Sequence, residues 1–348
     1  MNSLNFKVIK TVCEWLEQGE RVFFVTVLNT WGASPRPVGS LFAFNVDKVK
    51  QVGSLSGGCV EEDLIQFLAK KALVLKQEKD TSDKYNNQKS PLFFLKLYGD
   101  KDGDRERYLL PCGGTLELLI EPLFDKCQYD HFLKIQTYLT AHKPIARVVN
   151  FLNSELSYAL AVDKKIHNKS QVLVFNHDAP QLFHRLDPMY QLLIVGAGDV
   201  AYYVTKLANS LDFTVTICEP RKEYAERLIS LDDTEIHYCL PDDLIRTTFS
   251  ESNTAIICLA HDPKVDDMAL IEALTNTKAF YVGAMGSMKT TENRMRRLKA
   301  LGLEESQIAR LHAPIGIDIH SKTPQEIAIS IIAELISVRY KVNSQYYP

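Results

Sequence analysis

The chain of 348 residues is longer than most single domains, so its length predicts two domains. Hydrophobic residues make up 46% of it and charged residues 24%, the balance of an ordinary soluble globular protein. The formal net charge of -3 gives no reason to expect a nucleic acid or an anionic membrane as partner, and no apolar run reaches the length of a membrane span.

The seven cysteines are odd in number and scattered, and none belongs to a CxxC pair. This spacing favours free thiols in a reducing cytoplasm over a disulfide framework or a structural zinc site. The histidines His261, His312 and His320 lack a metal-ligand spacing such as HxxxH, so they give no support for zinc either. We therefore expect a cytoplasmic protein.

The first part of the chain predicts an α+β domain over residues 1–185. Helical spacing of apolar residues begins at Leu4, and residues 77–90 are polar and aperiodic, as in an exposed loop. The segment 176–188 has two prolines and few apolar positions, which indicates the linker. Further helices are expected at 59–75 and 129–141, and strands at 21–30, 41–46, 49–55, 91–98, 145–152, 156–162 and 171–175.

A glycine-rich stretch at 53–63, GSLSGGCVEED, stands out in this domain. Gly57 and Gly58 allow consecutive N–H groups, with that of Ser56, to converge on one point, and the helix that begins at Cys59 directs its unpaired N–H groups to the same place. An anion would bind there, and a thiol in the first turn would ionise more readily than a free cysteine. The alternative is a tight turn before a helix with a buried cysteine.

Two further stretches carry candidate binding residues. In WGASPRPVGS, Arg36 lies between two prolines that restrict the backbone; it is either a clamp for a phosphate or carboxylate, or a surface arginine in a turn. In LLPCGGTLELLIEP, Cys112 precedes Gly113 and Gly114, which repeats the pairing of a cysteine with two glycines. The sequence alone does not fix how far this element lies from Cys59.

The second domain, residues 189–348, predicts a Rossmann-like parallel sheet. Gly196, Gly198 and Ala201 form GxGxxA between an apolar strand and a helix, and Glu219 ends the next strand, where an acceptor for a ribose hydroxyl is expected. This context predicts the fold. Whether the fold binds a dinucleotide is a separate question, because Asp199 puts a negative charge where a pyrophosphate would lie.

The same domain holds a second candidate anion site. Gly283, Gly286 and Ser287 follow an apolar strand and precede a helix rich in basic residues, at the carboxyl end of the sheet where ligands gather. Most of those basic residues are expected on a solvated helix face. Thr323, Pro324 and Glu326 predict a capping box that begins the last helix.

Taken in order, these stretches together with LLIVGAGDVA, YVGAMGSMKT and LHAPIGIDIHSKTPQEIA resemble the xanthine dehydrogenase accessory (XdhC/CoxI) family over nearly the whole chain. The chain has Asp199 where the family usually has histidine, and His320 where it usually has glycine. The resemblance implies a dimeric cytoplasmic maturation factor rather than an enzyme. Such a factor binds the molybdenum cofactor while a cysteine desulfurase supplies its sulfido ligand, and then inserts it into an apo molybdenum hydroxylase of the xanthine dehydrogenase type.

The residues fit this implication chemically. The cofactor carries a phosphate or a dinucleotide pyrophosphate, for which Ser56, Gly57, Gly58 and Arg36 are suitable partners, and a molybdenum atom with affinity for sulfur. The hypothesis is that Cys59 contacts the molybdenum, with Cys112 as the second choice. The alternatives are an NAD(P)-dependent oxidoreductase that uses the Rossmann domain, and a scaffold that only brings a sulfurtransferase and its target together.

Overall fold

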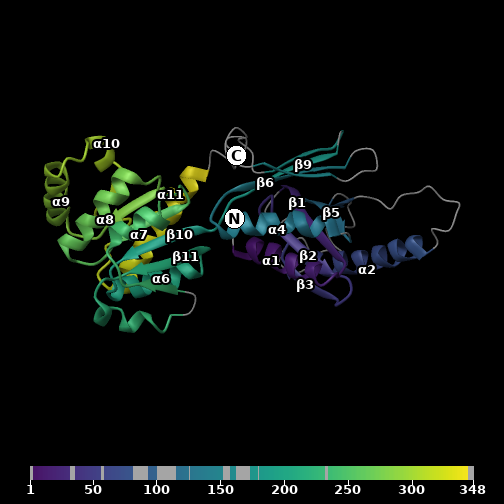
Figure 1. Cartoon of the computed structure of the whole chain (residues 1–348), viewed down its shortest axis with the longest axis horizontal. Helices are drawn as coiled ribbons and strands as arrows, with labels where there is room; N and C mark the ends of the chain where they lie inside the picture. Colours follow the sequence, from purple (N-terminus) through teal and green to yellow (C-terminus); the bar gives the residue numbers. More distant parts are fainter. Residues whose placement is uncertain are drawn as a thin grey trace. The chain divides into compact units, whose positions relative to one another are not determined.

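The computed structural model describes residues 3–31, 36–55, 59–80, 93–99, 115–124, 126–151, 157–161, 173–178, 180–231 and 234–343. The chain divides into two compact units, Met1–Pro188 and Met189–Pro348, which can be followed by colour in Figure 1. Each unit has its own sheets and its own buried core.

The first unit is built on an antiparallel five-stranded sheet, sheet A, with the strand order β3-β2-β1-β5-β4. The register between β1 and β5 shifts by one residue between Val27 and Asn29, which is a β-bulge. The strands are β1 (Val22–Trp31), β2 (Leu41–Asn45), β3 (Lys50–Gly53), β4 (Phe94–Tyr98) and β5 (Thr115–Leu123).

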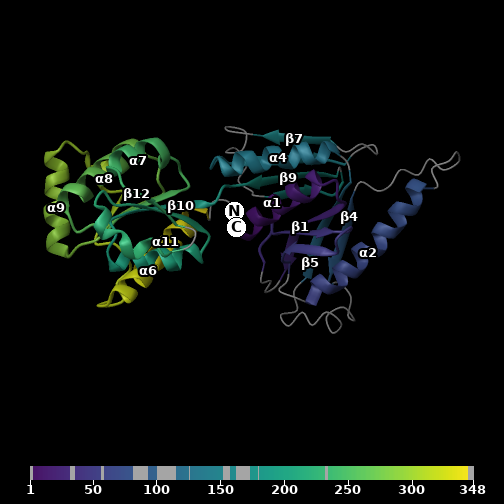
Figure 2. The same cartoon turned by 60° about the horizontal axis from the view of Figure 1, so that its bottom comes forward.

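Helices cover both faces of sheet A (Figure 2). Helix α2 (Cys59–Asp80) packs on one face, and α1 (Ser3–Glu17) and α4 (Lys126–Thr140) pack on the other. The alternation of side chains along β1 explains the two cores, because Phe23 and Val25 point to α2 whereas Val22 and Phe24 point to α1 and α4.

A second antiparallel sheet, sheet B, completes the unit with the order β7-β6-β9-β8. Its strands are β6 (Ile145–Asn150), β7 (Ser157–Ala161), β8 (Leu173–Asn176) and β9 (Gln181–Leu186). The linker predicted at 176–188 is therefore wrong, because β9 lies inside it and pairs with both β6 and β8. The first compact unit runs to Pro188.

The strand β9 escaped the sequence pattern because polar side chains occupy buried positions. His184 is buried opposite Arg147 of β6, and burial together with that guanidinium lowers its pKa to about 3. Arg147 is fully buried and donates to both oxygens of Glu121 at 3.0 and 2.7 Å, beside the rings of Phe24 and Phe132. This ion pair replaces the apolar residues that a strand between two layers usually has.

The second unit has a six-stranded parallel sheet with the order β12-β11-β10-β13-β14-β15. Strand order reverses at β10, which is the arrangement of the Rossmann fold, so the predicted fold class is confirmed. The strands are β10 (Tyr190–Val195), β11 (Phe213–Cys218), β12 (Thr234–His237), β13 (Thr254–Cys258), β14 (Tyr281–Ala284) and β15 (Leu311–His312).

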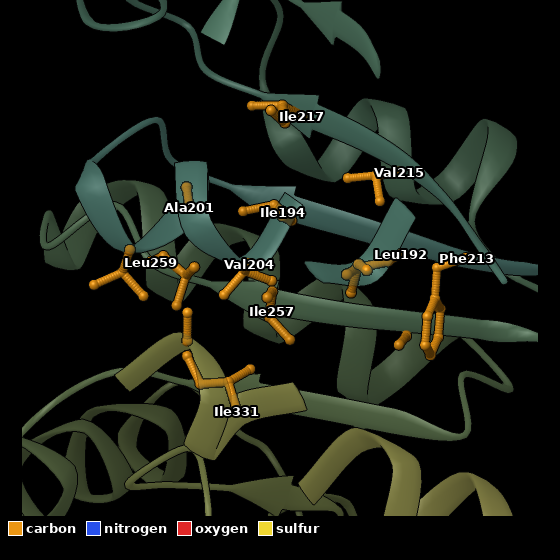
Figure 3. Close-up of a cluster of buried hydrophobic side chains, with 14 of the residues drawn as sticks. Leu192, Ile194, Ala201, Val204, Phe213, Val215, Ile217, Ile257, Leu259 and Ile331 are labelled. Carbon is orange, nitrogen blue, oxygen red and sulfur yellow. The ribbon is translucent and has the colours of Figure 1, made fainter. Parts of the chain in front are cut away.

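Helices cover this sheet on both faces. Helices α6 (Asp199–Asn209) and α11 (Pro324–Asn343) form one apolar layer with the sheet, part of which Figure 3 shows around Ile194, Val204 and Ile331. Helices α7 (Pro241–Thr248), α8 (Pro263–Asn276), α9 (Met288–Ala300) and α10 (Glu305–Ile308) lie on the other face, and short 3-10 turns occupy Lys222–Tyr224 and Glu226–Leu228.

Most predicted elements are present, and the differences lie at their ends. Helix α2 continues to Asp80, so the loop predicted at 77–90 is wrong at its start, and residues 81–92 lie outside the described part. The capping box is confirmed, because Thr323 Oγ1 accepts from the N–H of Glu326 at 3.3 Å and the N–H of Thr323 donates to the Glu326 carboxylate at 2.9 Å.

Candidate functional site

Five strand ends of sheet A lie at the same edge of the sheet, which we call the loop edge. In the register, Trp31 at the end of β1 is opposite Thr115 at the start of β5, and Tyr98 at the end of β4 is opposite Leu116. On the other side of β1, β2 starts and β3 ends, because Phe42 pairs with Gly53.

The three motif-bearing loops of the first unit all connect strand ends at the loop edge. Residues 32–40 join β1 to β2, residues 54–58 join β3 to α2, and residues 99–114 join β4 to β5. Three inter-strand spacings of about 4.8 Å, or about 14 Å, separate β3 from β5 across the sheet. The register also places Gly53 level with Ile120, which lies five residues, or about 17 Å, along β5 from Thr115. The fold therefore places on the same end of the sheet, although staggered along it, the elements whose separation the sequence left open.

Several predicted site residues lie in parts of these loops outside the described residues. Ser56, Gly57 and Gly58 are among them, as are Cys112, Gly113 and Gly114, so their roles stay predictions. Cys59 is the first residue of α2, as expected.

Glu61, in the first turn of α2, fixes the segment before the glycine pair. It is buried, and its Oε1 accepts from the backbone N–H of Leu55 at 2.8 Å and from Ser54 Oγ at 3.0 Å. The carboxylate thereby joins the first turn of α2 to the exit of β3, while Glu62 is exposed. The glycine loop is held at both of its ends.

The first turn of α2 is also attached to β4. Asp63 accepts from the hydroxyl of Tyr98 at 2.9 Å and pairs with Lys96 at 3.2 Å. Cys59 lies one helical turn before Asp63.

Arg36 precedes a turn that is fixed by hydrogen bonds. The N–H and the Oγ of Ser40 both donate to the carbonyl of Pro37, and Gly39 has a φ of +84°, where a side chain would be strained. Asn5 donates to the carbonyl of Gly39 at 3.1 Å. Arg36 itself is half-buried.

The cysteines buried in the described residues are poor nucleophiles. Burial raises the pKa of Cys13 to about 12, aided by Glu14 and Glu17, and burial also raises the pKa of Cys218 and Cys258. These three thiols belong to apolar cores. A reactive thiol is therefore to be sought elsewhere, and Cys59 and Cys112 remain the candidates at the loop edge.

In the second unit, the two glycines of GxGxxA differ in what they do. Gly196 has a φ of +106°, and a Cβ there would lie 2.5 Å from the Cα and N of Ala260, so the fold itself requires glycine. Gly198 is extended, with no atom within 4 Å of a Cβ. Open space at Gly198 is what the approach of a ligand to the start of α6 needs.

Charged residues surround this turn. Glu219, buried at the end of β11, accepts from Arg221 Nε at 2.8 Å and from its Nη2 at 3.2 Å, and Arg221 Nη1 lies 3.8 Å from Asp262. Asp199 pairs with Arg227. The negative charge of Asp199 is thus offset locally, and the acceptor expected for a ribose is engaged by an arginine.

The turn after β14 is stabilised by contacts with residues of α9. Ser287 caps α9 by accepting from the N–H of Thr290, and a Cβ on Gly286 would lie 3.1 Å from the side chain of that threonine. Arg294 is buried and is the exception on a helix face where Arg296 and Lys299 are exposed, as expected for most of its basic residues. It donates to the carbonyl of Met285 at 3.1 Å and to Asp266 at 3.3 Å.

Asp266 in turn accepts from the N–H of Ala260 at 3.2 Å, so a buried ion pair links the turns after β13 and β14. Burial raises the pKa of Asp266 to about 6 against the opposing effect of Arg294. Gly283 lies within β14, where a Cβ would meet Tyr281 at 2.6 Å and Ile315 at 2.7 Å, so packing alone accounts for this glycine.

Glu334 of α11 accepts three hydrogen bonds: from His312 Nδ1 at 2.9 Å, from Tyr281 at 2.5 Å and from the N–H of Gly316 at 2.6 Å. Burial raises its pKa, but these donors outweigh that effect and the pKa is lowered. The sequence did not single out Glu334, because its partners come from three distant segments.

The described side chains include no group of three or more histidines, cysteines, aspartates or glutamates placed to hold a metal ion. Of the helices within the described ranges, none combines the length and apolar character that crossing a membrane requires.

The fold and the gathered loops define a two-part protein: an α+β unit with cysteine and glycine loops at one sheet edge, and a Rossmann unit. Residues 15–79 match the XdhC and CoxI family, and residues 192–335 match the XdhC Rossmann domain. The chain therefore belongs to the XdhC and CoxI family, and the resemblance drawn from the sequence is confirmed.

Two relatives match over most of their length. A probable xanthine dehydrogenase subunit from Bacillus subtilis (strain 168) is 23% identical over 343 residues, covering 94% of this chain and 96% of that protein. The molybdenum cofactor insertion chaperone PaoD of Escherichia coli (strain K12) is 25% identical over 342 residues, covering 95% and 88%. The crystal structure of a xanthine dehydrogenase from Bacillus halodurans shares the fold, with a TM-score of 0.71. The match covers 97% of this chain and 96% of that chain, and the two sequences are 24% identical.

Proposed function

We propose that this chain is a cytoplasmic maturation factor that binds the molybdenum cofactor, holds it during sulfuration by a cysteine desulfurase, and inserts it into an apo molybdenum hydroxylase of the xanthine dehydrogenase type. The cofactor is cargo, and the chain acts as its carrier, as a homodimer. The similarity to an insertion chaperone supports the role.

The observation that carries the proposal is the convergence at the loop edge. The loops bearing Arg36, the glycine pair with Cys59, and Cys112 leave the same end of sheet A, and the Arg36 loop joins the two strands that lie between the other two loops. A phosphate suits the start of α2, where the helix dipole is positive, and soft sulfur suits molybdenum. The donor set at this edge therefore fits a ligand that carries both groups.

In this account, Glu61 and Asp63 are positioning residues. Glu61 fixes the exit of β3, and Asp63 fixes the first turn of α2 to β4. Ser56, Gly57 and Gly58 would receive the phosphate, Arg36 would clamp it, and Cys59 or Cys112 would bind the metal end. Gly113 and Gly114 would let the backbone approach the cargo.

The test is a transfer assay. The chain is purified from cells that make the cofactor and mixed with apo xanthine dehydrogenase-type enzyme, a cysteine desulfurase and cysteine. We expect the chain to carry molybdopterin and to restore activity in proportion to the molybdopterin lost from it. A purified chain free of molybdopterin, with no effect on the apoenzyme, would refute the proposal.

The second candidate is an NAD(P)-dependent oxidoreductase, and the open space at Gly198 is the observation that favours it. Gly196, Gly198 and Glu219 would bind the dinucleotide at the β10 turn, and Gly283, Gly286 and Ser287 would border it. In that case NAD raises the apparent melting temperature of the wild type in a saturable way, and Gly198→Ala abolishes the rise. The carrier proposal predicts that neither the wild type nor Gly198→Ala oxidises or reduces NAD(P).

A further inference from the structure

A polar cluster of three side chains lies at the loop edge on the face of sheet A opposite α2. Asn29 Nδ2 donates to Glu117 Oε2 at 2.7 Å, and His177 Nε2 lies 3.4 Å from Glu117 Oε1. Asn29 comes from β1, Glu117 from β5, and His177 follows β8 of sheet B. Two elements of sheet A and one of sheet B therefore meet at one carboxylate.

The β-bulge creates this cluster. Without it, Leu28 would stand opposite Glu117 and Asn29 opposite Leu116. The bulge shifts the register so that Asn29 stands opposite Glu117. Bulges near functional sites commonly redirect a side chain in this way. The cluster lies two residues from the Trp31 and Thr115 pair that marks the edge.

Glu117 differs in its partners from Glu121, four residues along the same strand. Glu121 is neutralised by the two-pronged ion pair with Arg147. Among the described residues, Glu117 has no lysine or arginine partner, only the asparagine amide and a half-exposed histidine. A carboxylate has about four acceptor positions, so Glu117 keeps acceptor capacity at an edge where its side chain is 13% exposed.

The charge and the open acceptors indicate a ligand with neighbouring N–H donors. A pterin ring presents an amino group and a ring N–H side by side, which a carboxylate can accept together. We propose that Glu117, oriented by Asn29, is the specificity-determining residue that recognises the donor edge of the pterin ring of the cargo. This inference rests on the proposed function. It adds the part of the site that recognises the pterin ring, whereas the residues named above recognise the phosphate and the metal.

The experiment compares two probes that differ at that edge: 6-hydroxymethylpterin and 6-hydroxymethyllumazine, which has an oxygen in place of the amino group. A site built for an N–H donor rejects the analogue that lacks it. By fluorescence titration, we expect the wild type to bind the pterin at least about tenfold more tightly than the lumazine, that is, a ratio of the two dissociation constants of at least about ten. Glu117→Gln should reduce this ratio to about one, because it presents an amide in place of the two acceptor oxygens.

A matched control is Glu235→Gln, which removes the carboxylate of another glutamate–histidine pair, Glu235 with His237 at 2.9 Å, in the second unit. It should leave the ratio unchanged. Asn29→Ala should lower the ratio partly, and circular dichroism checks that each variant is folded.

The amount of molybdopterin bound by each purified protein distinguishes a failure of the proposed carrier function from a failure of the inference about Glu117. If the wild type carries molybdopterin but Glu117→Gln keeps the preference for the pterin probe, Glu117 is a structural tie and this inference fails alone. If the wild type carries no molybdopterin and binds neither probe, the proposed function fails and takes the inference with it. Loss of the preference in Glu117→Gln only, with the control unaffected, supports both.

Discussion

Replacing Gly196 with alanine tests the account of the Rossmann turn. The φ of +106° is one that a residue with a side chain adopts only with strain, at a cost of about 1–3 kcal/mol. The new Cβ would also lie 2.5 Å from backbone atoms of Ala260, which cannot rotate away as a side chain would. Forced overpacking of this kind adds about 1–3 kcal/mol.

The two costs sum to about 4 kcal/mol for Gly196→Ala, which corresponds to a fall in melting temperature of about 8–16 °C for a unit of this size. Gly198→Ala is the matched control, because Gly198 is extended and its Cβ would meet nothing within 4 Å. Alanine is a poor residue at a helix N-cap, so this control should cost about 1 kcal/mol or less.

The assay uses the position of the tryptophans. Trp15 and Trp31 both belong to the first unit, so their fluorescence follows that unit, whereas circular dichroism follows both. Gly196→Ala should lower the transition seen by circular dichroism and leave the fluorescence transition in place. Equal destabilisation by the two alanine variants would refute the assignment of strain to Gly196 and of open space to Gly198.

Three further results are expected. Glu61→Ala leaves the buried N–H of Leu55 without its acceptor, so it should cost about 1–3 kcal/mol by urea unfolding and lower the retained molybdopterin, whereas Glu62→Ala should do neither. The raised pKa of Asp266 means that its folded form binds the proton more tightly, so it adds stability below about pH 4 that is lost as the pH rises through about 6. The pH dependence of the circular dichroism transition should therefore weaken between those values in Asp266→Asn, and an unchanged dependence would contradict the assignment. Glu334→Gln places an amide N–H group among three donors, so it should lower the melting temperature of the second unit by several degrees, and an unchanged melting temperature would show that these contacts contribute little.

Local patterns were sufficient for most elements of the fold. The apolar spacing of α1, the glycine pair before α2 and the GxGxxA turn before α6 each predict an element from neighbouring residues, and each element is present. Strand β9 was missed because His184 and Arg185 interrupt its apolar alternation, and His184 is buried opposite the arginine that pairs with Glu121. A buried ion pair of this kind joins residues far apart in the sequence and leaves no local signal.

The arrangement of the candidate site could not be predicted for a related reason. Which loops share an edge of sheet A depends on the pairing of β1 with β5, residues separated by about 90 positions, and on a bulge that no local pattern marks. The sequence did not distinguish Arg294 from the exposed basic residues of its helix, because its partner Asp266 lies 28 residues away. The types of residue at the site can be predicted from local motifs in the sequence. Their contacts cannot, because they join residues that are distant in the sequence.

The central claim is that the loop edge binds the molybdenum cofactor through its thiols, and the molybdopterin content of purified variants tests it most directly. Wild type, Cys59→Ala, Cys112→Ala and the double variant are compared with Cys239→Ala, which changes a half-buried thiol of the Rossmann unit. The account predicts normal content in Cys239→Ala, reduced content in at least one single variant at the loop edge, and almost none in the double variant. Full loading of the double variant would contradict it.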